Sequence, residues 1–103
     1  MDMKQARRVE IIIEAVMERR VGQVLTEAGV TGFTMLPVLG GSGRSGHWTR
    51  EGGVGRASGM IAVICLCAPH RLDRLLDALF PVLTDHIGVV SVTDTQILRA
   101  ERF

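Results

Sequence analysis

Three residues in a glycine-rich segment have the types and spacing that suit anion binding. Gly41 and Gly43 flank Ser42, and Arg44 follows directly. Glycine lets backbone N–H groups approach an anion closely, and an adjacent guanidinium adds a fixed positive charge with a bidentate fork of donors. Most glycine clusters are only flexible loops. The pattern therefore indicates a binding site only if the fold places it at the end of a strand.

An aromatic pair follows a few residues later in the same segment. His47 and Trp48 are adjacent there. An exposed tryptophan can anchor a partner protein, or it can fold back and cover the base of the loop. The sequence leaves both interpretations open.

The cysteines and carboxylates do not indicate metal binding or catalysis. Cys65 and Cys67 are two residues apart in an apolar run and lack the paired ligand spacing of structural zinc sites. They are expected to be reduced core thiols. The carboxylates form no cluster suited to magnesium. We therefore predict no catalytic residue and no metal site.

Composition restricts the classes of partner. A chain of 103 residues makes one domain, and 12 basic against 11 acidic residues do not favour nucleic-acid binding. No apolar stretch approaches the roughly 20 residues that span a bilayer, and a signal-peptide core is absent at the N-terminus. We expect a cytoplasmic protein. Its hydrophobic content of 47% is hard to bury in so small a monomer, which favours an oligomer.

Hydrophobic periodicity predicts the elements that must position these residues. Apolar, β-rich runs predict strands at 9–13, 33–39, 60–67 and 87–98, and residues 60–67 are expected to be the most buried strand, covered on both faces. Amphipathic spacing predicts helices at 16–28 and from 69 to about 80. Pro37 suggests an edge strand or bulge, and Pro81 is expected to end or kink the second helix.

The segment 40–59 holds most of the chain's 12 glycines and is expected to be a long, mobile loop without regular structure. The element order is then βαββαβ. This predicts an α+β, ferredoxin-like domain, with a four-stranded antiparallel sheet and two helices on one face. The other, apolar face is expected to be covered by copies of the same chain.

These motifs resemble the PII signal-transduction superfamily over nearly the whole chain. Gly32-Phe33-Thr34, followed by the G-x-G-R sequence at 41–44, resembles the second strand of that family and the base of its T-loop, here at about 40–59. The closing VSVTDTQILR resembles its last strand. The resemblance implies a PII-type trimer that binds an adenine nucleotide between subunits.

The resemblance also implies roles for individual residues. It assigns nucleotide contacts to Thr34, Gly41, Gly43, Arg44, Arg99 and Arg102. Thr34 has an alternative role as an ordinary strand residue. For Arg102 a solvated terminal charge is an equal alternative.

The chain departs from the family pattern in ways that affect which ligands we expect it to bind. The loop contains no tyrosine to be uridylylated, and the turn at 84–87 lacks the family's phosphate-binding lysine. We therefore expect ADP or AMP to bind at least as well as ATP. The compact loop most resembles the carboxysome-associated PII-like proteins. That group implies bicarbonate sensing, for which Ser42, Arg44 and Ser58 are candidates, and a regulated bicarbonate transporter or carboxysome component as partner.

Two other functions compete with a sensor. A weak nucleotide hydrolase is disfavoured by the missing lysine and by the lack of a magnesium-binding carboxylate cluster. A structural or metal-tolerance trimer like the CutA proteins would share the architecture. It would leave the G-x-G-R loop unexplained.

Overall fold

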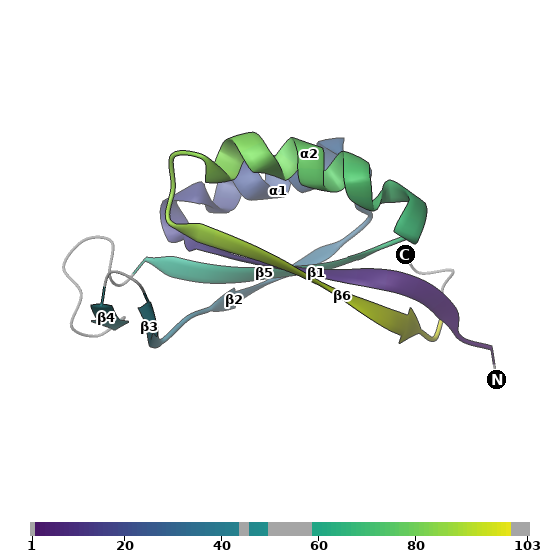
Figure 1. The fold of residues 1–103 in the computed structure, drawn as a ribbon, viewed down its shortest axis with the longest axis horizontal. Helices are drawn as coiled ribbons and strands as arrows, with labels where there is room; N and C mark the ends of the chain where they lie inside the picture. The colour runs from purple at the N-terminus through teal and green to yellow at the C-terminus, as the bar shows by residue number, and fades with distance from the viewer. Residues whose placement is uncertain (1, 44–45, 50–58, 100–103) are drawn as a thin grey trace.

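The computed structural model describes residues 2–43, 46–49 and 59–99. Four strands make one antiparallel sheet in the order β2-β5-β1-β6, and two helices cover one of its faces (Figure 1). The strands are β1 (Lys4–Glu14), β2 (Phe33–Pro37), β5 (Met60–Cys67) and β6 (Gly88–Ile97). The helices are α1 (Glu18–Glu27) and α2 (Leu72–Leu83), each preceded by a 3₁₀ turn, at Ala15–Met17 and Pro69–Arg71. The ferredoxin-like fold is confirmed.

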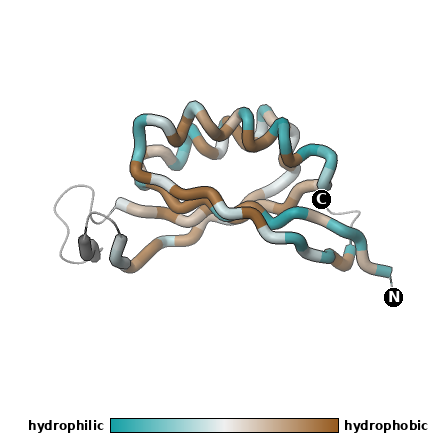
Figure 2. Tube along the Cα trace, viewed as in Figure 1, coloured by the Kyte–Doolittle hydropathy of each residue, from teal (hydrophilic) through white to brown (hydrophobic). Residues whose placement is uncertain are grey.

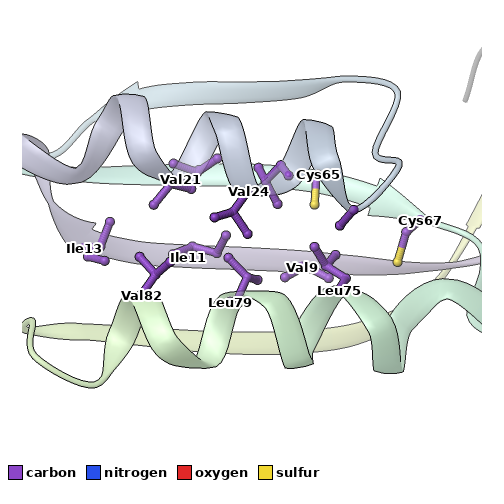
Figure 3. Packing of buried hydrophobic residues seen from close by; sticks show 13 residues of the cluster. Val9, Ile11, Ile13, Val21, Val24, Cys65, Cys67, Leu75, Leu79 and Val82 are labelled. Carbon is purple, nitrogen blue, oxygen red and sulfur yellow. The ribbon is translucent and has the colours of Figure 1, made fainter.

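The core lies between the helices and the sheet. In Figure 3, apolar side chains of α1 and α2 meet those of β1 and β5 in this layer. Its fully buried members include Ile11 and Ile13 of β1, Leu25 of α1 and Leu75 of α2. Alternate residues of each strand reach this layer because side chains of a strand point to opposite faces in turn.

The expectation that 60–67 is the most buried strand, covered on both faces, is met on one face only in a single chain. In β5, residues buried against the helices alternate with half-buried ones, whereas β1 holds Val9, Ile11 and Ile13 at 0% exposure. Only one face of the sheet is covered in a single chain. β1 is also longer than predicted, because the charged residues at its start belong to the strand, where Arg7 pairs with Asp94 at 2.7 Å.

The sequence predicts that Pro81 ends or kinks the second helix, and the first of these alternatives is wrong. Pro81 lies inside α2, which continues to Leu83. Proline removes one helical hydrogen bond, but here it lies on the exposed side, where water can satisfy the freed carbonyl. The hydroxyl of Thr84 donates to the carbonyls of Phe80 at 2.9 Å and Pro81 at 3.1 Å, which helps to close the helix end.

Two further expectations concern glycines. Gly29 follows α1 with φ of +89°, which confirms the left-handed helix end predicted there. The expectation that 40–59 lacks regular structure is wrong for its first part, because β3 (Gly40–Gly43) and β4 (Gly46–Thr49) pair as a second, two-stranded sheet. Backbone pairing needs no apolar periodicity, so hydrophobic patterning gave no sign of this hairpin.

Candidate functional site

The predicted anion-binding residues Gly41, Ser42 and Gly43 lie in the first strand of the β3–β4 hairpin, beyond the end of β2. Gly41 pairs with Trp48, and Ser42 pairs with His47. Gly41, Ser42 and Gly43 are exposed. Arg44 and Ser58 lie outside the described residues, and only the backbone of His47 and Trp48 is described.

Neither backbone strain nor crowding explains the glycine at position 43. Its φ is not positive, and a Cβ placed there would meet no atom within 4 Å. The described part of this chain would therefore accept a side chain at Gly43. Without a side chain, the backbone at Gly43 stays open to close approach, and anion binding uses this property.

The end of the sheet from which the hairpin extends is fixed by a buried carboxylate. Glu14, the last residue of β1, is 7% exposed. Its Oε1 accepts a hydrogen bond from the backbone N–H of Ile87 at 3.1 Å and lies 3.2 Å from Nδ1 of His86. The next residue, Ala15, donates its N–H to the carbonyl of Gly59. The turn at 84–87 and the point where the chain enters β5 are thus joined at one place.

Sequence reasoning missed Glu14. The available signal was an acidic residue that directly follows the apolar run of Ile11 to Ile13. A carboxylate in that position is rarely buried unless it has partners. Its partners are more than 70 residues away in the sequence.

Arg99 lies at the opposite end of the sheet from the hairpin. β6 begins with Gly88 opposite Ile13 and ends with Ile97 opposite Lys4. Its 10 residues span about 30 Å at the usual strand rise. Arg99 follows two residues later and is exposed, with φ of 64°, in the left-handed region that non-glycine residues seldom adopt. Arg102 lies outside the described residues.

Thr34 lies between these two ends, on the exposed edge strand β2. It is opposite Ile64 of β5 and is itself exposed. One chain therefore does not bring all the predicted nucleotide residues together. The glycines of the hairpin and Arg99 are separated by the length of the sheet.

An apolar row crosses the sheet face that the helices leave open. Leu36 is paired with Ala62, Ala62 with Ile12, and Ile12 with Val89, so the row includes one residue from each strand of the four-stranded sheet. Leu36 is 43% exposed and Val89 is 67% exposed. Figure 2 shows hydrophobic residues concentrated toward the hairpin end of the sheet and hydrophilic ones near the N-terminus. This row is apolar surface that a single chain cannot bury.

The two cysteines belong to the core, as predicted. Both are free thiols, and both side chains point into the layer between sheet and helices (Figure 3). Burial, reinforced by the neighbouring Cys67, raises the pKa of Cys65 to about 11. Burial also raises the pKa of Cys67, while Arg7 opposes this shift. Across the described ranges, no three His, Cys, Asp or Glu residues gather as a metal site would require.

Comparison with known proteins identifies the family. The model of the family "Nitrogen regulatory protein P-II" matches residues 6–102. The chain belongs to this P-II family. No curated protein sequence matches the chain. Over the described part of the chain, neither helix is long and apolar enough to cross a membrane.

Solved structures of PII-like proteins have the same fold. CPII, a nitrogen regulatory PII-like protein from Thiomonas intermedia K12, bound to ADP, AMP and bicarbonate, has a TM-score of 0.88 at 27% identity, over 99% of this chain and 96% of that one. The structure of CPII bound to ADP and bicarbonate has a TM-score of 0.84 at 28% identity, over 99% of this chain and 97% of that one. A PII-like signalling protein from Thermus thermophilus has a TM-score of 0.80 at 20% identity, over 100% of this chain and 99% of that one. At this identity the likeness supports the fold alone.

Proposed function

We propose that this protein is a homotrimeric PII-like sensor that binds ADP or AMP between subunits, together with bicarbonate. The observation that carries the proposal is the similarity to CPII bound to ADP, AMP and bicarbonate, at a TM-score of 0.88 over 99% of this chain. On this proposal the protein regulates a partner and catalyses no reaction.

The positions of the predicted nucleotide residues support a site shared between subunits. Gly43 in the hairpin and Arg99 beyond β6 lie at opposite ends of a strand about 30 Å long. One nucleotide cannot touch both within a single chain. In a closed ring of identical subunits, the Arg99 end of one chain meets the hairpin end of the next, and each interface then makes one site.

The open face of the sheet supports the trimer. The row of Leu36, Ala62, Ile12 and Val89 leaves apolar surface exposed on every strand. Burial of apolar surface is worth roughly 25 cal/mol per Å². Association through this face would remove that surface from water.

The hairpin supports a role as the responsive element. Gly41, Ser42 and Gly43 offer exposed backbone to an anion. On this proposal Arg44 adds the guanidinium, and Ser42, Arg44 and Ser58 hold bicarbonate. Ligand binding then changes the surface that a bicarbonate transporter or carboxysome component contacts, with His47 and Trp48 as contact residues.

Calorimetric titration with AMP, ADP, ATP and bicarbonate tests the proposal. We expect adenine nucleotides to bind with one site per subunit, and we expect bicarbonate to bind more tightly when nucleotide is present. No phosphate should be released from ATP over hours. The proposal would be overturned if none of the nucleotides bound to the trimer, or if the protein hydrolysed ATP with turnover.

A further inference from the structure

A cavity of about 240 Å³ lies at the end of the molecule opposite the hairpin. It is formed where four elements meet: the start of β1, the end of β5, the end of α1 and the 3₁₀ turn that leads into α2. None of its lining residues belongs to the proposed nucleotide site. The inference drawn from it therefore stands independently of the proposed function.

Of the described residues that line this cavity, three are basic and none is acidic. Lys4 comes from β1, and His70 and Arg71 come from the turn before α2. Within the described ranges, none of the three side chains has a hydrogen-bond or ion-pair partner. Arg7 and Arg8 on the same sheet differ, because Asp94 lies 2.7 Å from one and Glu10 lies 3.2 Å from the other. The cavity thus has a concentration of positive charge that the described part of the chain does not neutralise.

The guanidinium of Arg71 lies close to Gly29, just beyond the end of α1. Its Nη1 lies 2.6 Å from the place that a Cβ of Gly29 would occupy. Gly29 has φ of +89°, a conformation that favours glycine, and the guanidinium occupies the space that a side chain would fill there. The guanidinium of Arg71 therefore lies beside Gly29, and both residues line the cavity.

The buried residues that line the cavity have apolar side chains. Cys67 is 4% exposed, Leu75 is 1% exposed and Ala28 is 5% exposed, whereas Lys4, His70 and Arg71 are exposed and form the rim. A fully hydrated inorganic anion gains little from such an interior. An anion with a short apolar tail can bury the tail and place its charge on the rim, where Arg71 presents a bidentate fork.

We propose that this cavity binds a small aliphatic carboxylate, with its tail against Cys67 and Leu75 and its carboxylate on Arg71 and Lys4. The volume is below the range of about 300–1,000 Å³ typical of drug-sized ligands, which limits the tail to a few carbons. The ligand class is thus a short-chain fatty acid or a comparable carboxylate metabolite.

Methyl NMR on the intact protein, saturated with ADP, provides the test. Hexanoate is the probe, hexanol has the same tail without the charge, and inorganic phosphate has the charge without the tail. We expect hexanoate to shift the methyl signals of Val30, Leu66 and Leu75, which line the cavity, and not that of Leu36 on the open sheet face. Hexanol and phosphate should each bind at least about tenfold more weakly.

Two matched variants separate the cavity from general charge. Arg71→Gln should weaken hexanoate binding by about tenfold or more. Arg74→Gln removes an exposed cation of α2 that does not line the cavity, and it should leave binding unchanged. If Arg71→Gln lowers the melting temperature, Lys4→Gln on β1 gives a second test of whether a cation at the cavity holds the carboxylate.

Three results would overturn the proposal. One is an equal loss of binding in Arg71→Gln and Arg74→Gln. Another is equal affinity for hexanol and hexanoate, which would leave the cations no role. The last is competition between hexanoate and ADP, which would place the carboxylate in the nucleotide site.

Discussion

Oε1 of Glu14 lies 3.2 Å from Nδ1 of His86 and accepts the backbone N–H of Ile87 at 3.1 Å. This contact joins the end of β1 to the turn before β6, across more than 70 residues of sequence. The neighbouring Ala15 bonds to Gly59, where the chain returns from the glycine-rich segment. The end of β1 is therefore where three parts of the chain converge, two joined by the Glu14 carboxylate and the third by the backbone of Ala15.

Replacement of this carboxylate should lower stability. Glu14→Ala removes the acceptor of the Ile87 N–H and the partner of His86, so the free energy of unfolding should fall by about 1–3 kcal/mol. Glu14→Gln keeps an oxygen acceptor and should lose less. Urea unfolding measures both, with Glu18→Ala, an exposed residue of the first turn of α1, as control. A loss in Glu14→Ala no larger than in the control would show that the contact does not contribute.

The elements could be predicted from sequence because their apolar spacing is local. The residues of α1 that pack on the sheet, Val21, Val24 and Leu25, recur at helical intervals. The prediction failed where the deciding contact was not apolar or not local. The β3–β4 hairpin is held by backbone pairing, and Pro81 is tolerated because it faces solvent within α2.

The open sheet face gives a direct test of assembly. Val89 is 67% exposed in the single chain and belongs to the apolar row across the sheet. Val89→Glu would place a charge in the trimer interface, where its desolvation is unfavourable, so the variant should dissociate at micromolar concentration. Sedimentation velocity measures this against wild type. Val16→Glu, at 76% exposure in the turn before α1, is the control and should remain trimeric. A trimeric Val89→Glu would show that this face is not the interface.

Mixing two binding-defective variants tests whether each site is shared. Arg99→Ala and Arg44→Ala should each weaken ADP binding by about tenfold or more. When the two are unfolded together in equal amounts and refolded, about one quarter of the interfaces combine an intact Arg99 with an intact Arg44 from the next subunit. Calorimetry should then recover that fraction of tight sites. No recovery would mean that both residues act within one subunit.

Nucleotide preference provides a further test. The turn at 84–87 carries no lysine or arginine to offset the charge of a third phosphate. We expect ADP and AMP to bind at least as tightly as ATP, because a γ-phosphate without a cationic partner loses more in desolvation than it gains. Calorimetric dissociation constants in the same buffer measure this. A strong preference for ATP would show that a cation elsewhere in the trimer takes this role.

The buried thiols predict a loss of stability at alkaline pH. Cys65 is 2% exposed, and its pKa is raised in the folded chain from 9.0 to about 11. The folded state therefore keeps a proton that the unfolded state releases, so this contribution is complete below pH 9 and is lost as pH rises toward 11. By about pH 10.5 the loss from this group should reach about 2 kcal/mol.

Comparison with a variant isolates this effect. Urea unfolding of wild type and Cys65→Val at pH 7.5 and pH 10.5 measures how far each loses stability between the two values. The variant should lose less, although Cys67 still contributes in the same direction. Equal losses in the two proteins would contradict the raised pKa of Cys65.

The candidate sites were harder to predict than the fold. Glycine and arginine spacing predicted an anion-binding segment at residues 41–44, and the family resemblance added Arg99. Neither could show that Gly43 and Arg99 lie toward opposite ends of the sheet, because the pairing register sets this. The basic cavity was missed because Lys4, Gly29 and Arg71 are distant in sequence and meet only in the folded chain.

The length of β6 has a consequence for how such a protein would respond to dilution. A ligand that needs the hairpin of one chain and Arg99 of another binds only to assembled chains, so its binding and the association equilibrium are thermodynamically linked. At a ligand concentration 100 times its dissociation constant, each occupied site stabilises the assembly by about 2.7 kcal/mol. Nucleotide would then lower the protein concentration at which the trimer falls apart, and dilution of the protein would release nucleotide.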